Sequence, residues 1–170
     1  MKKLFLFAAL AVFGFSNVNA QEEGFKLGVT LALPMGDAGD GWSFGATLDA
    51  TYLFDVADSF QLGATTGYQH FFGKTEEIDM GVFGTVEVEF DDAQFIPLAA
   101  SARFYASEDF FFGADLGYAL GLNEGNDGGF YYRPKVGYNL GGASILASYS
   151  GVSMDGFTFS YVGVGVEFGL

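Results

Sequence analysis

The residues that could carry covalent chemistry are few and widely spaced. His70 is the only histidine of the 170-residue chain, and there is no cysteine. Disulfides, thiol nucleophiles and cysteine-based metal sites are therefore excluded. A histidine can activate a serine hydroxyl for acyl transfer or hydrolysis, and Ser43, Ser148 and Ser150 are available. No nucleophile motif, phosphate-binding loop or metal triad accompanies them, so the sequence predicts no enzyme and no cofactor.

Carboxylates are concentrated in one segment, residues 73–93. Besides the single Lys74 it holds seven acidic residues: Glu76, Glu77, Asp79, Glu87, Glu89, Asp91 and Asp92. Carboxylate oxygens suit Ca²⁺, and Asp37 and Asp40 could add to them, but no EF-hand spacing exists and no metal site is predicted. Two interpretations stay open: a solvated loop, or a surface that contacts a ligand or a divalent cation.

The N-terminal residues predict export. Two lysines at positions 2 and 3 precede an apolar run from Leu4 to Phe15, and the stretch closes with Val18, Asn19 and Ala20. A basic start, a short apolar run and a small residue at the end are typical of a secretory signal peptide. We expect residues 1–20 to be removed, which leaves residues 21–170 as one domain.

The charge balance restricts the partners. Without Lys2 and Lys3 the chain keeps five basic residues against all 21 acidic ones, a formal charge of −16. Such a chain repels nucleic acid, whose affinity comes mainly from Lys and Arg at phosphates. It is not a disordered composition, because aromatic residues make up 18% and the mean hydropathy is +0.28.

Apolar and polar residues alternate with a period of two in eight segments. Strict alternation of this length indicates strands, and most segments match the 9–11 residues of a tilted transmembrane strand. The sequence therefore predicts an all-β chain with strands over residues 25–33, 42–54, 60–72, 94–105, 110–121, 130–140, 144–150 and about 157–170. Residues 85–90 also alternate, so the third and fourth strands are expected to extend as a hairpin above the membrane.

The position of the charges decides what these strands face. Within the strands every ionisable residue other than His70 lies on the glycine-rich polar face: Lys26, Asp49, Arg103, Asp115, Arg133, Lys135 and Glu167. The bulky apolar face carries none, as contact with lipid demands. The last residues, YVGVGVEFGL, show the same division. The sequence predicts an eight-stranded antiparallel up-and-down transmembrane barrel, with His70 on the lipid face.

The seven ionisable residues would then share a narrow lumen. Four are positive and three are negative, and buried charges of this kind must be paired. We expect a plug of salt bridges in a polar lumen, because the interior of an eight-stranded barrel is just filled by side chains. A small selective conduit is the alternative.

The connections and aromatic residues predict the orientation of the barrel. The connections over residues 34–41, 73–93, 122–129 and 151–156 are longer than those over 55–59, 106–109 and 141–143, and short turns are periplasmic in outer-membrane barrels. Both termini would then be periplasmic. Aromatic residues collect at the strand ends, which suggests interfacial girdles: Trp42, Tyr68, Phe72 and Tyr132 at the loop end, and Phe54, Phe60, Phe104, Phe110 and Phe168 at the turn end.

The chain resembles the small eight-stranded outer-membrane barrels of the OmpA/OmpX type. The resemblance covers residues 21–170 and is sharpest at Gly165, Phe168 and Leu170, which look like the terminal signal read by the barrel-assembly machinery, although the last residue is Leu and not Phe. It implies the outer membrane of a Gram-negative cell envelope, outer-membrane lipid and the assembly machinery as partners, and a monomer.

The resemblance does not imply one function, because barrels of this type include adhesins, tethers and lipid-modifying enzymes. We expect a non-enzymatic protein with a structural or surface-interaction role. The alternatives are a porin-like conduit, a lipid-modifying enzyme that uses His70, and a soluble lipocalin-like binder.

Overall fold

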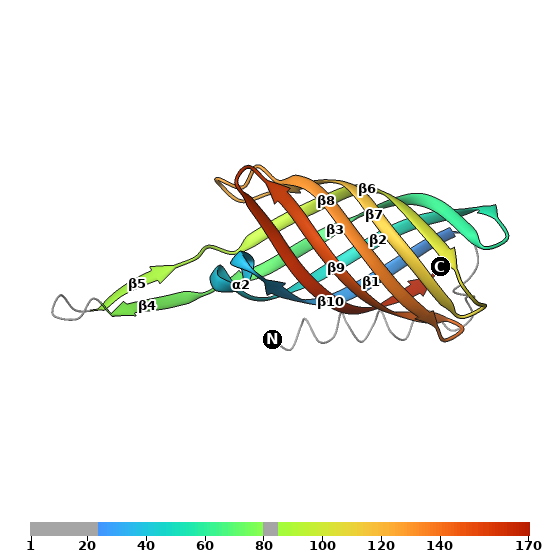
Figure 1. Ribbon diagram of the computed structural model, residues 1–170, viewed down its shortest axis with the longest axis horizontal. Coiled ribbons are helices and arrows are strands. Elements are labelled where there is room, and N and C mark those ends of the chain that lie inside the picture. The colour runs from blue at the N-terminus through green and yellow to red at the C-terminus, as the bar shows by residue number, and fades with distance from the viewer. Residues whose placement is uncertain (1–23, 80–84) are drawn as a thin grey trace.

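Eight strands close into an antiparallel barrel in the computed structural model, which describes residues 24–79 and 85–170 (Figure 1). Each strand pairs with the next barrel strand along the chain, and the first pairs with the last to close the ring. The prediction of an eight-stranded up-and-down barrel is confirmed. The signal peptide predicted over residues 1–20 lies outside the described residues. The barrel strands are β1 (Gly24–Met35), β2 (Trp42–Ala57), β3 (Phe60–Gly73), β6 (Ala93–Tyr105), β7 (Phe110–Gly121), β8 (Gly129–Asn139), β9 (Ala143–Met154) and β10 (Phe157–Gly169).

The two ends of the barrel differ. At one end, the turn end, β1 begins, β10 finishes, and short connections join β2 to β3, β6 to β7 and β8 to β9. The other end, the loop end, carries the short helix α2 (Asp37–Gly41), the hairpin of β4 (Thr75–Asp79) and β5 (Thr85–Glu89), and a connection over residues 122–128. In the ranges that the structure describes, no helix is long and apolar enough to cross a membrane.

One predicted loop is wrong. The seventh strand was expected to end at Ser150 and to be followed by a connection over residues 151–156, but β9 continues to Met154. Only Asp155 and Gly156 separate it from β10, and Met154 pairs with Phe157 across this turn. Gly156 has a φ of +77°, a conformation that glycine adopts without steric cost. The alternation fades over residues 150–152 because all three are buried.

The wall of the barrel has its polarity reversed relative to a water-soluble barrel. Along β1 the side chain of Lys26 is 1% exposed, whereas Phe25 is 56% and Leu31 is 70% exposed. The same alternation of buried and exposed positions runs along the other barrel strands, except at residues 150–152 of β9. The result is a belt of exposed Leu, Val, Ile, Phe and Tyr around a largely polar interior.

Trp42 departs from the predicted pattern. Alternation placed it on the outer face beside Phe44, as part of an aromatic girdle. The pairing of β2 with β3 is irregular between Trp42 and Gly45, and such an irregularity redirects a side chain. The Trp42 ring instead packs on Phe159, 5.0 Å away between centroids, and its indole N–H donates to the carbonyl of Asp91 at 3.0 Å.

The hairpin of β4 and β5 is a separate two-stranded sheet that projects beyond the loop end (Figure 1). A hairpin is thus present where the sequence predicted one, but it is a sheet of its own and not a continuation of β3 and β6. Lys74 secures its root: the backbone N–H donates to Gly41, the carbonyl accepts from Phe90, and Nζ donates to the carbonyl of Gly39 at 2.5 Å. Phe90 also packs on Trp42, with centroids 5.7 Å apart.

Candidate functional site

Asp115 is the centre of a buried ionic network in the middle of the barrel. Its Oδ1 accepts from Ser101 Oγ at 2.6 Å and its Oδ2 from Arg133 Nε at 2.7 Å. Lys135 Nζ lies 2.9 Å from both oxygens. All three partners come from adjacent strands, since Asp115 pairs with Ser101 of β6 and Arg133 of β8 in the backbone register.

Two ion pairs cross the whole interior. Arg133 of β8 also donates from Nη1 to Asp49 Oδ2 of β2 at 2.9 Å, and Arg103 Nη2 of β6 donates to both oxygens of Glu167 of β10 at 2.8 and 3.0 Å. In the closed order of strands, β8 and β2 are four positions apart, as are β6 and β10. Each pair therefore joins opposite walls of the eight-stranded ring.

Small residues make room for these long side chains. A Cβ at Gly113 would lie 2.9 Å from Lys135 Cε and 3.1 Å from its Cγ, which is closer than carbon atoms normally pack. The Arg103 guanidinium also stacks on Phe111, 4.1 Å from the ring centroid, a favourable cation–π contact. Gly113 therefore leaves the space that the Lys135 side chain occupies beside Asp115.

The structure places all seven predicted lumen residues in the interior. None of Lys26, Asp49, Arg103, Asp115, Arg133, Lys135 and Glu167 is more than 8% exposed. Six of them form the contacts above, and Lys26 is buried on β1 in the same interior. Sequence alternation gave the face that these residues share. It could not give their pairing, which depends on how strands four positions apart are staggered around the ring.

The loop-end part of the interior is apolar, which the expectation of a polar lumen missed. Phe71 contacts Phe159 and Tyr161 with centroids 4.7 and 4.8 Å away, and Phe95 lies 5.4 Å from Phe159. All four are at most 1% exposed, and Tyr131 is buried with them. We call these five residues the aromatic plug. They lie at inward positions near the loop end of their strands, and the sequence pattern assigned none of them to either face.

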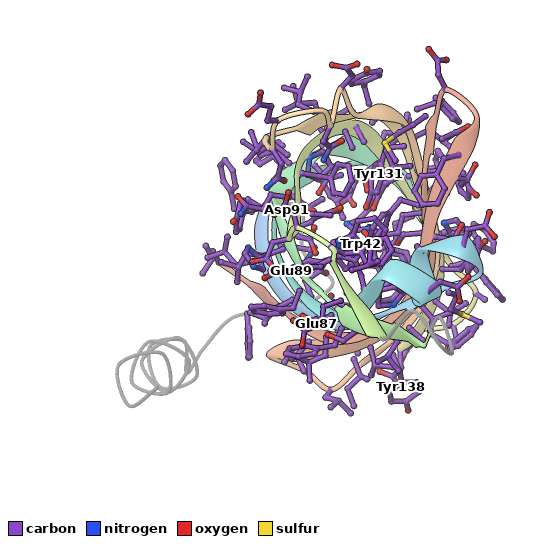
Figure 2. The ribbon with its side chains drawn as sticks, turned by 90° about the vertical axis from the view of Figure 1, so that its left-hand side faces the viewer. Trp42, Glu87, Glu89, Asp91, Tyr131 and Tyr138 are labelled. Carbon is purple, nitrogen blue, oxygen red and sulfur yellow. The ribbon has the colours of Figure 1, made fainter. Side chains whose placement is uncertain are left out.

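A small cavity opens above the aromatic plug at the loop end. It has a volume of about 280 Å³, with Trp42, Phe95, Phe157 and Phe159 among its lining. Residues 91–93 and the connection over residues 123–126 also line the cavity, and we call them its rim. Seen from this end, Trp42 and Tyr131 lie within the ring of strands and Asp91 lies beside Trp42, whereas Tyr138 lies outside (Figure 2). We call this space the mouth cavity.

His70 lies on the outer wall near the loop end. One ring nitrogen, Nδ1, is 3.1 Å from the Tyr68 hydroxyl, and Nε2 is 3.0 Å from Asp92 Oδ2. Asp92 Oδ1 accepts the N–H of Gly73 at 3.0 Å. Neither nitrogen meets a serine: Ser43 donates to the carbonyl of Phe72, and Ser148 and Ser150 lie on β9, away from β3. The geometry is that of a histidine tying the base of the hairpin to the wall.

The other predicted residues lie at the two ends. Glu87, Glu89 and Asp91 are exposed at the hairpin, Glu87 pairs with Glu77 in the backbone register, and Asp79 pairs with Thr85. Glu76 pairs with Val88. Within residues 24–79 and 85–170, no three His, Asp or Glu residues come together as a metal-binding group. At the turn end, Gly165 is buried, Phe168 is half-buried and Leu170 is exposed.

Comparisons with known proteins bear on the fold. No protein-family model matches the chain, and no curated protein sequence matches it. The structure is similar to that of the Yersinia pestis outer membrane protein Ail in a phospholipid bilayer nanodisc, with a TM-score of 0.55 and 13% identity, covering 88% of this chain and 100% of that one. The crystal structure of Ail gives a TM-score of 0.53 at 15% identity, covering 86% and 99%. A designed transmembrane β-barrel gives 0.52 at 8%, covering 90% and 100%.

The chain therefore has the fold of the small eight-stranded transmembrane β-barrels. Two of these three structures are of Ail, a bacterial outer-membrane protein. This agrees with the resemblance seen in the sequence. At these identities the likeness concerns architecture. What this chain does must be argued from its own wall, interior and loops.

Proposed function

We propose that the chain is a non-enzymatic integral protein of a bacterial outer membrane, with a closed interior and a structural or surface-interaction role. The observation that carries the proposal is the apolar belt. Leu98, Leu116 and Val164, which lie near the middle of three strands, are each more than half exposed. Contiguous apolar surface of this extent is rare on monomeric soluble proteins. Lipid around the barrel removes the free-energy cost of exposing these apolar side chains to water. The closed ring of strands also leaves no strand edge with unpaired backbone groups.

The buried charges support the same environment. Charged side chains in the middle of the barrel are buried in its interior. Six of them find a partner of opposite sign there: Arg133 with Asp49 and Asp115, Lys135 with Asp115, and Arg103 with Glu167. A lipocalin-like binder would place charges outward and an apolar ligand inward. The interior here is polar in its middle, so the soluble alternative is disfavoured.

Orientation and assembly belong to the same proposal. The turn end, with both ends of the barrel chain, would face the periplasm, and the hairpin would face outward. Residues 1–20 would be the export signal. Phe168 and Leu170, on the outer face of the last strand, and Gly165 would form the signal for the barrel-assembly machinery. The protein would act as a monomer.

The acidic hairpin is the proposed interaction face. It projects past the barrel, and Glu87, Val88 and Glu89 are exposed on β5. Its root is held to the barrel by contacts of Lys74, Trp42 and Phe90. An exposed, negatively charged projection suits contact with cationic groups of an extracellular ligand, and its charges also oppose aggregation through the strand edges.

We expect the barrel not to conduct ions. The Arg133–Asp49 and Arg103–Glu167 pairs cross the lumen, and the aromatic plug fills the space toward the loop end. In a planar bilayer, the purified protein should therefore give no steady conductance level under conditions in which a porin gives one. A reproducible open level from the protein would contradict the closed interior and favour the conduit.

A further inference from the structure

The mouth cavity is separate from the ionic network and from the outer wall. Its base is the top of the aromatic plug, where Phe95 and Phe159 are each 1% exposed. Residues of β2, β6, β9 and β10 and two connections contribute to it. The cavity is therefore a depression at the loop end with an aromatic floor, and the interior beneath it is filled.

The aromatic floor is held in place. Trp42 packs against Phe157, Phe159 and Phe90, with centroid distances of 6.4, 5.0 and 5.7 Å. Its indole N–H is bound to the carbonyl of Asp91, so one ring edge is fixed at the rim. A preorganised aromatic surface can bind an apolar group without first ordering its own side chains.

The rim is negatively charged. Of the residues that line the cavity, all of which are described, Asp91, Asp92 and Glu124 are acidic and none is basic. Asp92 contacts His70 and Gly73, but the exposed carboxylates of Asp91 and Glu124 make no hydrogen bond or ion pair with the described residues. Lys74, the one basic residue of the acidic segment, directs Nζ to the carbonyl of Gly39.

We propose that the mouth cavity binds a small organic cation, an ammonium group attached to an aromatic or aliphatic body. The body lies on Trp42, Phe157 and Phe159, and the charge lies at Asp91 and Glu124. Both components attract a cation, because an aromatic face is electronegative and the rim carboxylates have the opposite charge. A liquid water molecule occupies about 30 Å³, so a cavity of about 280 Å³ suits a ligand of roughly ten non-hydrogen atoms.

The chain carries its own reporter for this site. Trp42 is its only tryptophan, so any tryptophan fluorescence change reports on the floor of the mouth cavity. The folded protein in a nonionic maltoside detergent is titrated with benzyltrimethylammonium, and in parallel with benzyl alcohol, which has the same ring without the charge. A choline-headed detergent is avoided because its own head group resembles the ligand.

The expected result is a saturable change with benzyltrimethylammonium at a Kd of about 1 mM or below. The double variant Asp91→Asn, Glu124→Gln should raise that Kd about tenfold, since each exposed charge contributes a factor of roughly three. The matched control Glu108→Gln, an exposed acid at the turn end, should leave it unchanged. A gel-mobility assay with and without boiling checks that each variant is folded.

Three outcomes would overturn the proposal. One is the absence of a saturable response to the cation. Another is an equal response to benzyl alcohol, which would mean that the cavity takes apolar groups regardless of charge. The third is an unchanged Kd in the folded double variant, which would place the cation elsewhere. None of these depends on the membrane location of the barrel, so the proposal fails or stands separately from the proposed function.

Discussion

Replacing Asp115 with asparagine is expected to lower the free energy of unfolding by about 3–5 kcal/mol, the cost of leaving buried charges without their partner. The carboxylate holds both Arg133 and Lys135 at distances below 3 Å. Asparagine has nearly the same shape and can still accept from Ser101, so packing changes little. What is lost is the carboxylate that pairs with Lys135, the only one to do so within residues 24–79 and 85–170. Urea unfolding of the protein in lipid vesicles measures the change.

Two controls separate this effect from a general effect of the substitution. Asp127→Asn changes an exposed acid in the connection after β7 and should cost less than about 0.5 kcal/mol. Adding Lys135→Met to Asp115→Asn removes one unpaired cation and should restore part of the loss, since residues in one network are not additive. If Asp115→Asn costs no more than Asp127→Asn, the ionic network does not stabilise the barrel.

Replacing Leu116 with arginine is expected to cost about 2–4 kcal/mol, the penalty for arginine on the lipid face near the bilayer midplane. Leu116 follows Asp115 in the middle of β7 but lies on the opposite face and is 54% exposed. In a water-soluble protein an exposed leucine accepts a charge with little loss of stability. The same unfolding measurement in vesicles therefore tests what the wall contacts.

Leu122→Arg is the matched control for depth. Leu122 is 48% exposed and lies just beyond the loop end of β7, so the arginine should cost only about 0–1 kcal/mol near the interface. A large cost at position 116 together with a small one at 122 supports a bilayer around the middle of the barrel. Small costs at both positions would mean that water, and not lipid, covers the wall.

Much of this architecture follows from the alternation of residues. Each predicted strand overlaps an observed one, and β7 has the predicted bounds, Phe110–Gly121. A strand that faces lipid on one side and a crowded interior on the other tolerates few exceptions, so its pattern is strong. β9 is the exception: residues 150–152 are all buried, so the pattern there stops before the strand does.

The parts that the sequence did not predict depend on contacts between distant segments. Trp42 was assigned outward because alternation assumes regular pairing, and the irregularity before Gly45 turns it inward. Phe71, Phe95 and Phe159 belong to three strands and meet only when the ring closes. The contact of His70 with Asp92 joins β3 to the segment after β5. The alternation of residues along a strand cannot predict such a contact between separate segments.

These differences change the account of the site. The sequence predicted salt bridges in the lumen and left the acidic segment open between a solvated loop and a contact surface. The structure shows ion pairs that cross the lumen and a projecting hairpin. The mouth cavity, which combines Trp42 with the rim acids Asp91 and Glu124, could not be found from spacing. Its residues come from positions 42 to 159 and share no motif.

The central claim is that the apolar wall contacts outer-membrane lipid around a closed barrel. The most direct test is to express the chain in a Gram-negative host, separate outer membrane from periplasm, and run the fractions on SDS gels with and without boiling. The account predicts protein in the outer-membrane fraction whose mobility changes on boiling. Periplasmic protein of unchanged mobility would contradict it, because the exposed leucines and valines would then face water.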